Sequence, residues 1–148
     1  MSNAALAIEL APTSTTVIDP VEGVTYATRF ELSRFGAHDG VIIAIDARGA
    51  ESLVLDGFHK PVGIALLGRV LVVADARARA VFRITLVAGR AVSRLQLAAL
   101  PDRPELVHAC DDDSVEVTSY DATGQPSAVR RIWLDGRVAI ISATTASA

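Results

Sequence analysis

One strand pattern recurs about every 46 residues along the chain, and it constrains the fold more than any other feature. The second strand of each unit begins near Val24, Val70 and Val115. The middle unit is the clearest, with β-branched runs at 61–66, 69–75, 81–87 and 92–97. Four short strands in about 40 residues predict a four-stranded antiparallel sheet, and three such units predict an all-β chain.

The outer two units repeat the pattern more loosely. Upstream, the matching runs are 23–28, 40–47 and 51–55, with the first strand supplied by 6–18. Downstream, they are 104–110, 114–120, 128–134 and 137–142. The pairs Asp39-Gly40, Asp56-Gly57 and Asp135-Gly136 are typical of tight turns. We therefore expect one β domain over residues 1–148, with units at about 6–57, 58–100 and 101–144.

Composition argues against several classes of protein. Apolar residues make up 51% of the chain and aromatic residues only 5%, which predicts an aliphatic core. A net charge of −3 does not suit a nucleic-acid-binding protein. The longest apolar window, 61–74, contains Arg69 and is too short to span a bilayer, and no basic region precedes the first apolar stretch. With Cys110 as the single cysteine, we expect a cytoplasmic chain that binds neither nucleic acid nor membrane.

The middle unit carries a more specific motif. Residues 60–65 contain a Pro-x-Gly-Ile-Ala strand, 69–75 form a strand ending in Ala-Asp, and 80–84 contain Val-x-Arg-Ile after an Ala-Arg-Ala-Arg loop. Over 58–88 this order resembles a blade of the NHL and SMP-30/gluconolactonase families, which are six-bladed β-propellers. The resemblance implies that the three units are blades and that the chain is half of a propeller completed by oligomerisation. A β-sandwich or a small barrel is the alternative fold.

Five residues are candidates for binding a ligand or a partner. His59 and Lys60 precede an innermost strand, where they line either one end of a central channel or an ordinary surface loop. Asp75, at a strand end, either holds the following turn by hydrogen bonds or points its carboxylate into that face of the molecule. Arg77 lies in the turn after it. Trp133 is either a core residue or an aromatic anchor at an interface.

The run from 108 to 113 is the one candidate metal site, through His108, Asp111 and Asp113. It lacks the spaced ligands and the glycine of a calcium loop, and an Asp run between strands is typical of a solvated turn. Cys110 is expected to be a small buried apolar residue. We therefore expect no metal and no other cofactor.

Three functions are compatible with this pattern. The first is a non-catalytic binding or scaffolding subunit, and the second is a lectin-like module that binds a small molecule or a carbohydrate. The third, implied by the resemblance, is a divalent-metal lactonase of the SMP-30 type, whose site uses one Glu, one Asn and one Asp. Asn3 is the only asparagine in the chain, so the lactonase is the least favoured and catalysis is not expected.

Association follows from the blade number. Propellers close with roughly four to eight blades, and this chain encodes three. An open arc is expected to expose two blade faces lined by Val72, Ile84, Val117 and Ile132. We expect a homodimer that closes six blades, or another protein subunit in place of the second copy.

Overall fold

The computed structural model describes residues 16–30 and 40–143, which form twelve strands in three sheets. The first sheet contains β1 (Thr16–Asp19), β2 (Val24–Arg29), β3 (Gly40–Ile45) and β4 (Glu51–Phe58). The middle sheet contains β5 (Pro61–Leu67), β6 (Val70–Asp75), β7 (Ala80–Val87) and β8 (Arg90–Ala99). The third sheet contains β9 (Arg103–Ala109), β10 (Ser114–Tyr120), β11 (Pro126–Trp133) and β12 (Val138–Ala143).

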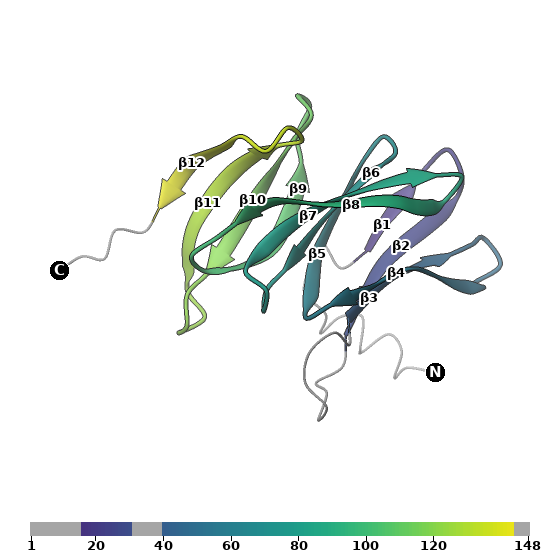
Figure 1. Ribbon diagram of the computed structural model, residues 1–148, viewed down its shortest axis with the longest axis horizontal. Coiled ribbons are helices and arrows are strands. Elements are labelled where there is room, and N and C mark those ends of the chain that lie inside the picture. Colours follow the sequence, from purple (N-terminus) through teal and green to yellow (C-terminus); the bar gives the residue numbers. More distant parts are fainter. Residues whose placement is uncertain (1–15, 31–39, 144–148) are drawn as a thin grey trace.

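Each sheet is an antiparallel meander in chain order. The sheets lie side by side with the middle sheet between the other two, and the first strands β1, β5 and β9 are neighbours (Figure 1). The predicted all-β fold of three four-stranded antiparallel sheets is therefore confirmed. In the described part of the chain no helix is long and apolar enough to cross a membrane.

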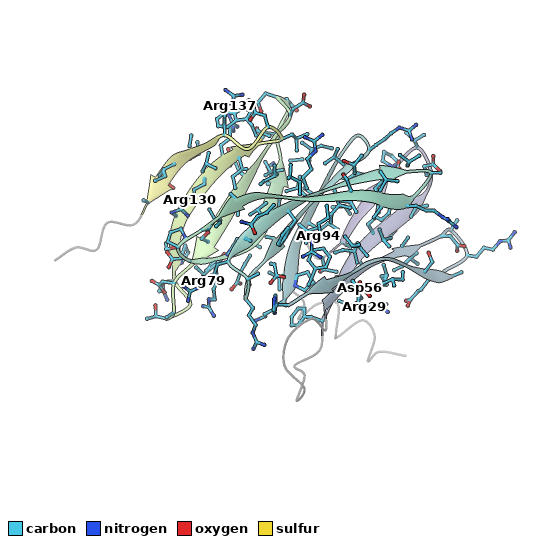
Figure 2. All side chains as sticks on the ribbon, in the orientation of Figure 1. Arg29, Asp56, Arg79, Arg94, Arg130 and Arg137 are labelled. Carbon is cyan, nitrogen blue, oxygen red and sulfur yellow. The ribbon has the colours of Figure 1, made fainter. Side chains whose placement is uncertain are left out.

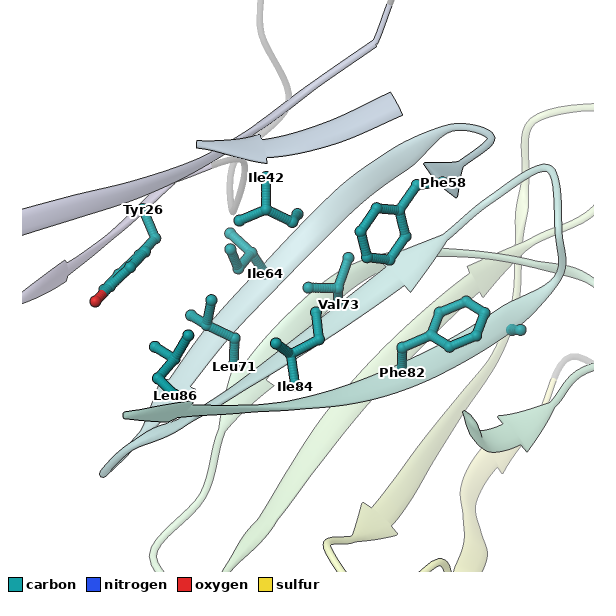
Figure 3. Packing of buried hydrophobic residues seen from close by; sticks show 10 residues of the cluster. Tyr26, Ile42, Phe58, Ile64, Leu71, Val73, Phe82, Ile84 and Leu86 are labelled. Atoms are coloured by element: carbon teal, nitrogen blue, oxygen red, sulfur yellow. The ribbon is translucent and has the colours of Figure 1, made fainter. Parts of the chain in front are cut away.

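The first and middle sheets enclose one aliphatic and aromatic core (Figure 3). Phe58 at the end of β4 meets Phe82 of β7 edge to face, with ring centroids 5.8 Å apart. Arg94 of β8 covers both rings, with its guanidinium 4.2 Å and 4.5 Å from their centroids, and donates hydrogen bonds to the carbonyls of Asp56 and Gly57. Figure 2 shows Arg94 between these two sheets, close to Asp56. One arginine thus closes the outer edge of the first junction.

The middle and third sheets enclose a second core with smaller side chains. Its fully buried members come from both sheets and include Val72, Val115, Val117 and Ile132. Arg83 of β7 crosses this junction and donates a hydrogen bond to the carbonyl of Leu134 at 2.8 Å. Each junction is therefore an apolar core that an arginine of the middle sheet crosses to reach a backbone carbonyl of the neighbouring sheet.

The innermost strands approach each other at a glycine. A Cβ atom on Gly63 of β5 would lie 2.7 Å from the carbonyl oxygen of Glu105 and 2.8 Å from Cγ2 of Val107, both on β9. Any side chain there would collide with the backbone of the next sheet. The Pro-x-Gly-Ile-Ala motif therefore encodes the close contact between β5 and β9.

Two sequence expectations are wrong in detail. Val72, Ile84, Val117 and Ile132 do not line exposed blade faces: all four have 0% exposure and fill the two junctions within the chain. The pair Asp56-Gly57 does not join two strands but lies inside β4, where the pairing with β3 shifts register and Gly57 has a φ of +85°. A glycine with positive φ occurs in β-bulges as well as in tight turns, so the Asp-Gly pair alone could not distinguish a bulge from a turn.

Candidate functional site

Antiparallel connectivity sorts the loops into two ends of the molecule. We define the turn end by the loops that join the first to the second and the third to the fourth strand of each sheet: 20–23, 46–50, 68–69, 88–89, 110–113 and 134–137. The linker end contains the opposite loops that the structure describes: 59–60, 76–79, 100–102 and 121–125. The predicted site residues divide between these two ends.

Four of the five binding candidates gather at the linker end. Asp75 is fully buried at the end of β6, and its carboxylate accepts hydrogen bonds from the backbone N–H groups of His59 at 2.7 Å and Lys60 at 2.9 Å. The same carboxylate accepts a third hydrogen bond, from the N–H of Ala78 at 3.0 Å. Asp75 thus ties the linker between sheets to the turn that carries Arg77, which is the first of its two expected roles.

Two of the remaining candidates at this end, Lys60 and Arg77, carry positive charge. The Lys60 ammonium lies 5.5 Å from the ring centroid of Phe30, and Arg77 is exposed in its turn. The carboxylate of Asp75 is fully buried and holds three backbone donors, which gives it a structural role. The binding role of His59, Lys60 and Arg77 stays a prediction.

Trp133 lies at the other end, on the face of the third sheet that points away from the middle sheet. It is partly buried, and the Arg137 guanidinium covers its ring at 4.7 Å from the centroid. It is therefore not a member of either described core, which leaves the interface role as the prediction to test.

The candidate metal cluster is spread over an exposed hairpin. His108, Asp111 and Asp113 are all exposed, and among the described residues no three His, Cys, Asp or Glu side chains are close enough together to hold a metal ion. Cys110 is only partly buried, contrary to expectation, because it follows the end of β9 instead of lying in a core. Asp112 accepts a hydrogen bond from Ser114, which holds the pKa of Asp112 below its ordinary value.

A cleft that the sequence did not reveal opens between the first and middle sheets at the turn end. It has a volume of about 500 Å³ and is lined by four hairpin loops, by carboxylates and by the ring of Tyr26. No local motif marks it, because its walls come from two sheets that are distant in sequence. The sequence contains only a weak signal for this cleft. Asp19 is the last residue of β1, and Asp46 directly follows β3 in the same sheet.

Three solved structures show what this arrangement is similar to. A gluconolactonase from Xanthomonas campestris matches with a TM-score of 0.71 and 16% identity over 88% of this chain and 46% of its own. Regucalcin from Agrobacterium tumefaciens, a calcium-binding protein, matches with a TM-score of 0.67 and 15% identity, over 82% of this chain and 42% of its own. A chain of a nidogen/laminin complex matches with a TM-score of 0.71 and 18% identity, over 88% of this chain and 48% of its own.

This chain has the fold of a β-propeller arc. The predicted resemblance to SMP-30/gluconolactonase and NHL-type propellers is confirmed at the level of fold, and each sheet is a blade. The chain spans less than half the length of each of these three proteins. No family model and no curated protein matches the sequence.

Proposed function

We propose that this chain is a non-catalytic binding or scaffolding subunit, and that two copies join their end blades to close a six-bladed propeller. The supporting observation is the half-length match: three blades align with 42–48% of the propellers named above. Closed two-fold assemblies are the commonest oligomers, and closure would cover both open ends of the arc. Residence in the cytoplasm and a different protein as the second half stay predictions.

The outward face of the first blade suits a partner surface. Strand register places Ile18, Val41, Ile45 and Leu53 on the side opposite the middle blade. Ile18 and Leu53 are 66% and 61% exposed. Large aliphatic side chains that lie on one blade face and remain exposed are typical of a protein interface.

The outward face of the third blade is more polar. Glu116 of β10 pairs with Arg131 of β11 at 3.3 Å, and Arg131 also lies 3.9 Å from Asp112. His108 and Trp133 share this face. Joining an aliphatic face to a charged one would give an interface less apolar than the junctions within the chain. We therefore propose a reversible association and not an obligate one.

The lactonase alternative is not favoured over this proposal. Its ligand set needs an asparagine, and Asn3 lies outside the described residues. The candidates His108, Asp111 and Asp113 do not converge on one point in the described structure. The second alternative, binding of a small molecule, is supported by the cleft between the first two blades.

A matched pair of substitutions tests the proposed closure. Leu53→Glu places a charge on the outward face of the first blade. Leu95→Glu places a charge on β8, away from both open faces. The two leucines have similar exposed fractions, 61% for Leu53 and 56% for Leu95. Sedimentation velocity at micromolar concentration should give a dimer for the parent chain and for Leu95→Glu, and a monomer for Leu53→Glu. Equal sedimentation of both variants would contradict the assignment of this face.

A further inference from the structure

The cleft between the first and middle blades has an acidic lining. Its walls include Asp19 and Glu22 from the β1–β2 hairpin and Asp46 and Glu51 from the β3–β4 hairpin, with Arg69 as the one basic residue among its lining side chains. Its volume of about 500 Å³ is within the range of small-molecule sites. It opens at the turn end, away from the linker end where His59, Lys60 and Asp75 gather.

A buried phenol points into this cleft. Tyr26 is only 3% exposed, yet its hydroxyl has no hydrogen-bond partner among the described residues. Figure 3 shows the hydroxyl at the end of the ring that points away from Ile42 and Ile64 in the core. A Cβ atom on Gly89, which also lines the cleft, would lie 4.0 Å from this hydroxyl. The ring is buried in the core while Tyr26 lines the cleft, so a ligand in the cleft can form a hydrogen bond with the unpartnered hydroxyl.

The carboxylates around the phenol are not equally engaged. Glu51 borders the cleft, but its carboxylate lies on the outward face of the first blade and is paired there with Arg29, at 2.6 Å and 2.7 Å. Asp19 accepts backbone N–H groups of its own hairpin through Oδ1, and its Oδ2 has no hydrogen bond among the described residues. The side-chain carboxylate of Glu22 has neither a hydrogen bond nor an ion pair among the described residues, and only its backbone N–H is engaged, by Asp19.

The charges of Asp19 and Glu22 act on the same phenol. Burial, followed by these two carboxylates, raises the pKa of Tyr26, so the hydroxyl stays neutral and can accept a hydrogen bond from a cation. An anion would be repelled by the two carboxylates. A bare metal ion would need three close ligands, which the described residues do not bring together.

We propose that the cleft between the first two blades binds a small organic cation that carries a primary amine. The amine donates one hydrogen bond to the Tyr26 hydroxyl and lies next to the carboxylates of Asp19 and Glu22. Asp46 also lines the cleft, from the neighbouring β3–β4 hairpin, and is the candidate contact for a second amine of the same molecule. This proposal is independent of dimer formation, because all of these residues belong to one chain.

The test is calorimetric titration of the full chain with 1,4-diaminobutane, using the uncharged isostere 1,4-butanediol as the control ligand. We expect the diamine to bind with a Kd between roughly 10 μM and 1 mM at low salt, to weaken as salt is added, and the diol not to bind. Absence of diamine binding, or equal binding of diamine and diol, would overturn the proposal.

Three variants locate the binding. Tyr26→Phe keeps the ring and removes the hydroxyl, so we expect about tenfold weaker diamine binding. Glu22→Gln should weaken binding about threefold at low salt, and Asp111→Asn, which removes an equivalent charge from the third blade, should not change it. A melting temperature for each variant checks that it folds. A folded Tyr26→Phe that binds within twofold of the parent would overturn the assignment.

Discussion

The middle and third blades use matching positions for opposite purposes. In the middle blade Ala65 and Val72 are cross-strand partners on the face that packs against the third blade. In the third blade a cross-strand pair on the corresponding face, which here points outward, is His108 and Glu116. Val72 has 0% exposure, whereas His108 is exposed and Glu116 partly so. Two copies of one repeat have therefore diverged where one has a neighbour and the other has none within the chain.

The arginine that pairs across the strands with Val72 or Glu116 shows the effect of a neighbouring blade. Arg83, which pairs with Val72, reaches across the junction to the carbonyl of Leu134. Arg131, which pairs with Glu116, turns instead to carboxylates of its own blade. Arg83 thus joins the middle blade to the third blade. Arg131, which has no neighbouring blade within the chain, is neutralised by carboxylates of its own blade. A partner for the third blade would have to match this charged row.

Exchanging the two chemistries should produce the largest effect. Val72→Glu buries a carboxylate in the apolar second core beside Arg83, whose guanidinium is already bonded to the carbonyl of Leu134, so we expect the free energy of unfolding to fall by about 3 kcal/mol. The reciprocal change, Glu116→Val, should alter it by less than about 0.5 kcal/mol in the single chain, because the Glu116–Arg131 pair is partly exposed. Chemical denaturation measures both free energies of unfolding. Equal losses for the two variants would contradict a difference between the covered face of the middle blade and the outward face of the third blade.

The contact between innermost strands should be nearly as sensitive. Gly63→Ala forces a Cβ against the Glu105 carbonyl, and we expect a loss of about 1–3 kcal/mol. Ser93→Ala, at an exposed site on β8, is the control and should change little. Denaturation midpoints that coincide for the two variants would place Gly63 outside the contact between blades. Gly136 is not a suitable control, because its φ of +95° would strain any other residue.

The first junction should depend on its arginine to a smaller degree. Arg94→Met keeps most of the stem but removes the contacts with Phe58 and Phe82 and two backbone hydrogen bonds, for an expected loss of about 1 kcal/mol. Arg90→Met lies on the same strand at an exposed position and should be nearly neutral. Thermal melts of the two variants that overlap would argue against closure of this junction by Arg94.

The ion pair on the outward face of the first blade should give the smallest effect. The hydrogen bond from Arg29 holds the pKa of Glu51 below its ordinary value. The stability from this pair is therefore present above the pKa of Glu51 in the unfolded chain and is lost as pH falls through the lower, folded value. Melting temperatures measured between about pH 6 and pH 2.5 should fall slightly more for the parent than for Glu51→Gln. Parallel curves would mean that the pair contributes nothing measurable.

The arrangement of strands could be predicted because local signals agree with it. The run at 61–66 became β5, and the runs at 69–75 and 81–87 became β6 and β7 within one residue. Which face of each strand is buried could not be predicted in the same way. Valine and isoleucine occur on both faces of the middle blade, since both are covered, and the sequence alone did not show that Val72 and Ile84 face different neighbours.

The candidate site was predictable only at the linker end. Asp75 was recognised because an Asp at a strand end before a turn has few roles, and the structure assigns it three backbone donors. The cleft was missed because Tyr26 becomes an unpartnered phenol only when the β7–β8 hairpin packs beside the first blade. A property that depends on two packed sheets has no signature in either strand.

The mass of the native particle tests the central claim most directly. Light scattering on the unmodified chain across the micromolar range should give a particle of twice the 15.5 kDa chain mass, with dissociation on dilution because the joined faces are mixed in polarity. Two chains of three blades would then close the ring. A particle of 15.5 kDa at every concentration would contradict self-closure of the propeller.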